Sequence, residues 1–124
     1  MNHQTLATVG RVVFALPFAI FGLMHFMAAG DMAGLVPEWL PGGTLWVYLT
    51  GAGLVAGAAG ILSGKQAQWA ALGIALLMAV FVLTVHLPGL LGGNQMSMSG
   101  LLKDTALGGA ALTYAALAFQ RNAQ

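Results

Sequence analysis

The sequence predicts an all-α integral membrane protein, a bundle of four helices that each cross a bilayer. Hydrophobic residues make up 59% of the 124-residue chain and charged residues only 6%, whereas soluble domains carry roughly 25% charged residues. Helices that span the hydrocarbon core need roughly 20 apolar residues. Four stretches of this kind are present, at residues 5–29, 44–63, 67–87 and 101–119. A chain of this length predicts one domain, residues 1–124.

The composition also excludes several classes of function. The net charge is only +1, from four Lys and Arg against three Asp and Glu, so no basic surface for nucleic acid is expected. The chain has no cysteine, which excludes thiol exchange, disulfides and thiolate metal sites as its own chemistry. A redox role would therefore require a bound cofactor or a quinone.

The first expected helix, residues 5–29, ends in an aromatic stripe capped by a histidine. Counting back from His25, the residues Phe21, Phe18 and Phe14 fall close to one helical face. Such a stripe is typical of ordinary packing between helices. It is also a surface that could line a ligand ring or tail.

A signal peptide is the alternative interpretation of this first segment. Residues 12–23 could form its apolar region, and the small residues Ala28, Ala29 and Gly30 could form a cleavage site.

The connector, residues 30–43, mixes apolar and acidic residues. Asp31, Glu38 and Trp39 lie among aliphatic residues and two prolines. This mixture favours a short segment lying in the membrane interface, or folded back over the mouth of the bundle, over a free loop. Trp39, Trp46 and Tyr48 would form an aromatic belt on this side of the membrane.

The second expected helix, residues 44–63, carries a stripe of glycines. Gly53, Gly57, Gly60 and Gly64 recur at helical spacing. Small residues in this pattern let another helix approach closely in a membrane. We expect this stripe to pack within the chain, the alternative being a homodimer face.

The distribution of charge predicts the orientation in the membrane. Arg11, Lys65 and Arg121 fall on the side of the termini, and the acids all fall on the opposite side. The positive-inside rule then predicts that both termini are cytoplasmic, in a multi-pass protein of the inner membrane. The acidic side would face outward.

The outward ends of three helices carry most of the remaining ionisable residues. His25 lies near the end of the first helix, His86 ends the third, and Lys103 and Asp104 open the fourth. We expect Asp104 to face the bundle, because small residues follow it along one helical face. These four residues would surround a mostly apolar small-molecule site. Alternatively, the histidines bind only headgroups and free carbonyls, and Asp104 only compensates the helix dipole.

The chain resembles the DoxX family of small four-helix membrane proteins, especially its DoxX-like branch. The resemblance is carried by FGLMHF, LVPEWLP, WVYLTGAGLVAGAAGIL, ALLMAVFVLTVHLPG and LLKDTALGGAALTYA, in that order. It implies a four-helix bundle with functional residues near one membrane face. The positions that it carries over are His25, Glu38, Trp39, His86, Lys103 and Asp104. Some relatives are subunits of quinone-linked oxidoreductases, notably for thiosulfate, and others are membrane partners of redox or maturation systems.

Three functions remain open at this point, and the sequence does not decide whether the protein is an enzyme. The first is a redox-associated protein that binds a quinone or a similar apolar ligand. The second is an assembly or scaffolding subunit with a membrane or periplasmic redox protein as partner, and with self-association left open. The third is Cu(I) handling, since Met24, Met27, Met32, Met96 and Met98 lie near the histidines in the chain. A bis-histidine haem between His25 and His86 is a variant of the third.

Overall fold

The structure, a computed structural model, describes residues 1–124 and is helical throughout. The long elements are α1 (His3–Met27), α3 (Thr44–Ser63), α4 (Ala67–Phe81) and α6 (Met96–Asn122). Between α1 and α3 lie α2 (Ala29–Met32) and the 3-10 helix η1 (Ala33–Leu35). A π-helical turn, η2 (Val82–His86), joins α4 to α5 (Leu87–Leu91). The predicted all-α class is confirmed.

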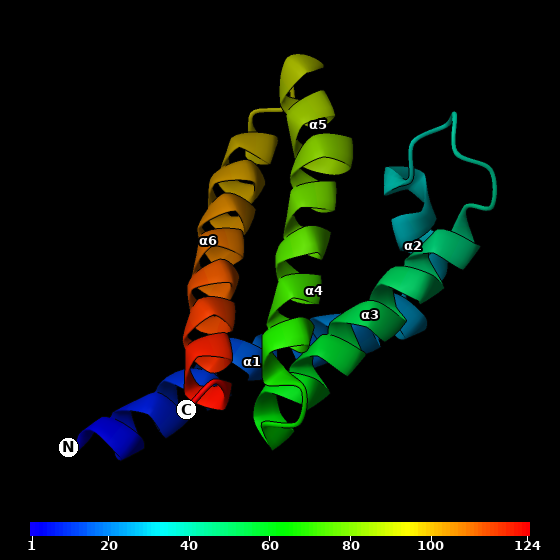
Figure 1. Cartoon of the computed structure of the whole chain (residues 1–124). Coiled ribbons are helices and arrows are strands. Elements are labelled where there is room, and N and C mark those ends of the chain that lie inside the picture. Colours follow the sequence, from blue (N-terminus) through cyan, green and yellow to red (C-terminus); the bar gives the residue numbers. More distant parts are fainter.

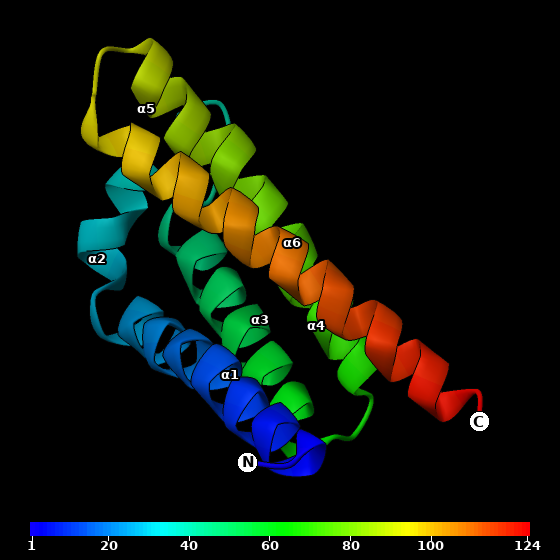
Figure 2. The ribbon, with the colours of Figure 1, turned by 90° about the vertical axis from the view of Figure 1, so that its left-hand side faces the viewer.

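The long helices form two packed pairs (Figures 1 and 2). α1 packs on α3, α4 packs on α6, and the contact of α3 with α4 joins the pairs. α1 and α6 share no extensive interface. Both termini and the α3–α4 turn lie at one end of the molecule, the terminus end. α2, η1 and α5 lie at the other, the connector end.

Three helical segments are long and apolar enough to cross a membrane. They are His3–Met27, Thr44–Ser63 and Ala67–Leu91, so the chain has the character of a multi-pass membrane protein. Large apolar side chains on these segments are exposed, including Leu6, Val13 and Leu76, which suits contact with lipid. The predicted fourth span lies within α6, which is less apolar and is not among the three.

One hydrophobic core joins the two helix pairs. Its largest fully buried side chains are Leu54 and Ile61 of α3 and Ile74 of α4. α1 contributes Ala15 and Phe18, and α6 contributes Ala111 and Ala115. The burial of these two alanines confirms that the small-residue face of α6 is the packed face.

Glycines set the close approach of the helices. A Cβ on Gly22 of α1 would lie 2.9 Å from the carbonyl oxygen of Gly51 on α3, so only glycine fits there without a shift. A Cβ on Gly57 would lie 2.7 Å from Ile74 Cδ1, and one on Gly60 would lie 2.6 Å from Ala70 Cβ. The glycine stripe of α3 therefore packs against α4, which confirms the expected packing within the chain.

The helical rod that starts at Ala67 does not end before Pro88, as the sequence predicted, but continues to Leu91. Proline lacks an N–H, and its ring collides with the carbonyl one turn earlier in an α-helix. Here the Leu87 N–H donates to the Val82 carbonyl, a π-helical bond, so the turn before the proline is widened. The wider turn lets the helix pass through the proline.

Other helix boundaries also differ from the predicted ones. α1 begins at His3 rather than residue 5, since the Asn2 side chain accepts a hydrogen bond from the Thr5 N–H, and it ends at Met27. α6 begins at Met96, five residues early, where the Asn94 side chain accepts from the Met96 N–H. Counting apolar residues locates the membrane-spanning part of a helix, whereas the end of the helix depends on its caps.

Candidate functional site

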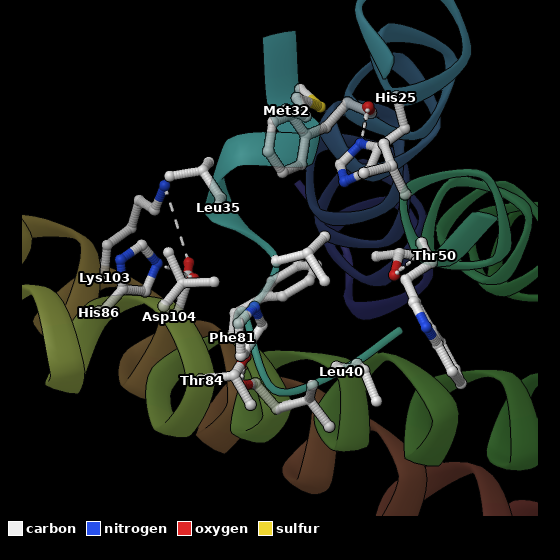
Figure 3. Close-up of a pocket in the computed structure, with 17 residues that line it drawn as sticks. His25, Met32, Leu35, Leu40, Thr50, Phe81, Thr84, His86, Lys103 and Asp104 are labelled. Atoms are coloured by element: carbon white, nitrogen blue, oxygen red, sulfur yellow. Dashed lines mark hydrogen bonds and ion pairs between the residues drawn. The ribbon is translucent and has the colours of Figure 1, made fainter. Parts of the chain in front are cut away.

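A cavity of about 220 Å³ lies at the connector end between the two helix pairs (Figure 3). Residues of α1, α2, η1, α3, α4, η2 and α6 contribute to its wall, and ten of the 17 lining residues are hydrophobic. The volume equals that of about seven water molecules at ~30 Å³ each. It suits one substituted ring or a group of similar size.

A hydrogen-bonded pair, His86 and Asp104, forms one wall of the cavity. His86 Nε2 lies 2.8 Å from Asp104 Oδ2, and the carboxylate can only accept, so the imidazole donates. Lys103 Nζ lies 3.7 Å from Asp104 Oδ1. The Asp104 side chain is only 7% exposed, whereas that of Lys103 is 64% exposed. The buried negative charge therefore depends mainly on His86.

His25 forms the opposite wall, on α1. It is buried, and its Nδ1 donates to the Phe21 carbonyl oxygen at 2.8 Å. Its ring meets Phe21 edge-on, with centroids 4.7 Å apart, and lies parallel to Phe81 at 6.3 Å. In Figure 3 the His25 ring stands across the cavity from the His86, Lys103 and Asp104 group. The two histidines therefore line one cavity without contacting each other.

Each histidine is seated over a glycine of the neighbouring helix. A Cβ on Gly51 of α3 would lie 2.7 Å from His25 Cβ. A Cβ on Gly100 of α6 would lie 2.5 Å from both Cε1 and Nδ1 of His86. The Cε1–Nδ1 edge of His86 thus faces the α6 backbone, while its Nε2 reaches Asp104.

The connector folds over the mouth of the cavity. The lining residues that it contributes are Met32, Leu35, Val36, Pro37 and Leu40. Trp46, at the start of α3, also lines the cavity, and its Nε1 donates to the Pro41 carbonyl oxygen at 2.5 Å. Of the two arrangements expected for this segment, lying in the membrane interface or folding back over the mouth of the bundle, these contacts favour the second.

The structure brings four of the six predicted site residues together. His25, His86, Lys103 and Asp104 all line this cavity. Glu38 and Trp39 do not line it, and Trp39 is 76% exposed, so their part in ligand binding stays a prediction separate from the cavity.

The aromatic stripe of α1 is divided between two environments. Phe18 lies in the core and Phe14 packs against it, with ring centroids 5.1 Å apart. Only Phe21 reaches the cavity. The expectation of ordinary packing therefore holds for Phe14 and Phe18, whereas the alternative of ligand lining applies only to Phe21, in the last turns of α1.

Several lining residues were not found from the sequence. Phe81 faces His25, and the hydroxyls of Thr50 and Thr84 donate to carbonyls of their own helices at Trp46 and Val80. Thr50 and Phe81 sit in apolar runs with no local signal. Thr84 carries one weak signal, since it precedes His86 by two residues in an otherwise apolar segment.

No group of three His, Asp or Glu side chains is close enough to hold a metal ion. The methionines of the copper hypothesis are dispersed, since Met27 is 85% and Met96 79% exposed, while Met32 lines the cavity. The volume of about 220 Å³ is below the roughly 300–1,000 Å³ of pockets for drug-sized ligands, which favours a ligand of one ring.

The comparisons with known proteins give a family without an assigned activity. No curated protein and no solved structure shows significant similarity to the chain. Residues 14–118 match the family described as Domain of unknown function (DUF8561). The match spans most of the chain and includes His25, His86, Lys103 and Asp104. The protein therefore belongs to the DUF8561 family.

Proposed function

We propose that this protein is a redox-associated protein of the inner membrane that binds a small apolar ligand, such as a quinone, at the connector end. The observation that carries the proposal is the single cavity with apolar walls that His25 and the His86–Asp104 pair line from opposite sides. Apolar walls with a few convergent polar groups are typical of small-molecule sites. The function is therefore ligand binding at one membrane face.

The placement in the membrane follows from charge. Arg11 lies in the first half of α1, Lys65 in the α3–α4 turn and Arg121 at the end of α6, which places all three toward the terminus end. The acidic side chains lie in α2, in the connector and in the first turns of α6, toward the connector end. By the positive-inside rule, both termini face the cytoplasm and the cavity lies near the outer face. α6 is the fourth span, with Lys103 and Asp104 at its outer end.

The proposed role of each group follows from the geometry. His25 contacts the polar head of the ligand, and the rings of Phe21 and Phe81 contact its apolar body. His86 orients the Asp104 carboxylate, and Lys103 places a positive charge at the rim. The resemblance to DoxX-like proteins supports the redox association, because some of those relatives belong to quinone-linked oxidoreductases.

Fluorescence of Trp46 offers a direct test. Trp46 lines the cavity, so a Trp39→Phe/Trp69→Phe protein retains one tryptophan, and it reports on the site. Titration with trimethyl-p-benzoquinone in detergent should quench this fluorescence saturably. Phe81→Ala, which removes part of the aromatic wall, should weaken binding, and His3→Ala, which changes an exposed residue at the terminus end, should not. Quenching that never saturates, or that is unchanged by Phe81→Ala, would contradict ligand binding at this site.

A second function, as a membrane assembly subunit, is favoured by one observation. Trp39 is 76% exposed and neighbours the exposed Glu38, outside the cavity. Exposed aromatic residues of this kind are enriched where proteins bind partners. A photocrosslinking amino acid at position 39 should then capture one defined partner in native membranes, and the same probe at position 6, on the exposed face of α1, should not.

A further inference from the structure

The His25 ring has a fixed arrangement of donor and acceptor. Its Nδ1 lies 2.8 Å from the Phe21 carbonyl oxygen, and a carbonyl can only accept, so the proton is on Nδ1. The other nitrogen, Nε2, has no hydrogen-bond partner in the protein. Figure 3 shows this nitrogen on the side of the ring that faces the cavity. What Nε2 offers a ligand therefore depends only on whether the ring is neutral.

The surroundings of His25 are apolar. The side chain is buried between Phe21 and Phe81, and no carboxylate lies within ion-pairing distance. With its one proton held on Nδ1, a neutral imidazole presents Nε2 to a ligand as an acceptor only.

The other polar groups of the cavity wall also offer acceptors. The hydroxyls of Thr50 and Thr84 donate to their own helices, so toward a ligand they retain only lone pairs. Asp104 is a carboxylate, and the Nε2–H of His86 is already bonded to it. The Cε1–Nδ1 edge of His86 faces the α6 backbone at Gly100, so Lys103, mostly exposed at the rim, is the lining side chain whose N–H groups remain open to a ligand. The interior of the cavity is thus rich in acceptors and poor in donors.

From this pattern we infer that the cavity selects ring-sized apolar molecules that carry a hydroxyl donor, and that this hydroxyl donates to His25 Nε2. The inference rests on the proposed ligand-binding function and specifies its chemical class. A carbonyl oxygen cannot bond to an acceptor, so a quinone is mismatched at His25, whereas the corresponding hydroquinone or a phenol is matched. Leaving Nε2 without a donor while water is displaced weakens binding.

The test compares three ligands of one shape. Calorimetric titration, without oxygen, uses trimethylhydroquinone, trimethyl-p-benzoquinone and the dimethyl ether of the hydroquinone. The hydroquinone should bind about tenfold more tightly than the quinone and the ether, which is the effect of one buried hydrogen bond. Equal binding of the hydroquinone and the quinone, or tighter binding of the quinone, would overturn the inference but leave the proposed function in place. Absence of binding by all three would overturn both.

Variants of His25 separate the hydrogen bond from the shape of the site. His25→Phe keeps a ring but removes the acceptor, so the three ligands should bind with similar affinity. His25→Gln retains an acceptor oxygen and should keep part of the hydroquinone preference, and it serves if His25→Phe fails to fold. His3→Phe, which changes an exposed histidine, should leave the preference intact. A preference that survives in His25→Phe would show that another group receives the hydroxyl, and the inference would be wrong.

Discussion

In each of the two helix pairs, one histidine packs against a glycine of the neighbouring helix, yet the two histidines make different hydrogen bonds. His25 of the α1–α3 pair lies over Gly51, and His86 of the α4–α6 pair lies over Gly100. His25 donates to a carbonyl of its own helix and leaves Nε2 free at the cavity, whereas His86 donates across the helix interface to a carboxylate. In His25 the protein uses Nδ1 and leaves Nε2 to a ligand, whereas in His86 the protein uses Nε2 itself. His25 is suited to bind, and His86 to position Asp104.

The largest expected effect is the loss of stability in His86→Ala. This substitution leaves the Asp104 carboxylate, 7% exposed, without its close donor. Leaving a buried charged acceptor without its donor costs about 3 kcal/mol, so the free energy of unfolding in detergent should fall by about that amount. Urea or SDS unfolding followed by circular dichroism measures it.

Two control proteins sharpen this prediction. Lys103→Ala should lower the free energy of unfolding by at most about 1 kcal/mol, because the lysine side chain is 64% exposed and its interaction with Asp104 is screened. The double variant His86→Ala/Asp104→Ala should be more stable than the sum of its single variants predicts. If His86→Ala costs no more than Lys103→Ala, His86 is not the main partner of the buried charge.

A smaller loss of stability is expected from a substitution at Gly51, the glycine against which His25 packs. In Gly51→Ala the new methyl group would lie 2.7 Å from His25 Cβ and 2.9 Å from the Gly22 carbonyl oxygen, so α1 must move. Overpacking of this kind costs about 1–3 kcal/mol. The matched control is Gly10→Ala on α1, where no atom lies within 4 Å of the new methyl group. Equal unfolding free energies for the two variants would mean that the helices are not in close contact at Gly51.

The smallest loss of stability is expected at Gly100, the glycine against which His86 packs. In Gly100→Ala the methyl group meets the ring of His86, which can rotate away where the backbone at Gly51 cannot. The loss should be about 1 kcal/mol, the net contribution of one hydrogen bond. Gly109→Ala on the same helix meets no atom within 4 Å and should gain up to about 1 kcal/mol from helix propensity. A gain in both variants would show that His86 does not depend on the glycine.

Part of the site could be predicted from the sequence because ionisable residues are scarce in this chain. With only 6% charged residues, each ionisable side chain near the end of an apolar run is conspicuous, and His25, His86, Lys103 and Asp104 were located in this way. The face of α6 that holds Asp104 followed from the small residues after it. Composition likewise gave the helical class and three of the apolar spans.

The rest depends on contacts between helices, which leave little trace in the chain. Gly51 and Gly100 matter because of what lies opposite them, and many other glycines in the chain look the same. Phe81 and Thr50 face the cavity because of how α4 and α3 are rotated about their axes. In the connector no helical period links position to direction, so Leu35 could not be told from Trp39, although the structure places only Leu35 at the cavity.

The π turn at Val82–His86 changes the rotation of the following residues about the helix axis, relative to the residues of α4 before it. The segment before it directs Ile74 and Met78 into the core, and the segment that ends it directs His86 toward α6. An additional residue in a helical turn rotates everything beyond it by about 100°. One residue inserted or deleted in this turn would therefore change the direction of the His86 side chain. The helix would stay continuous, and the packing of the core residues before the turn would be kept.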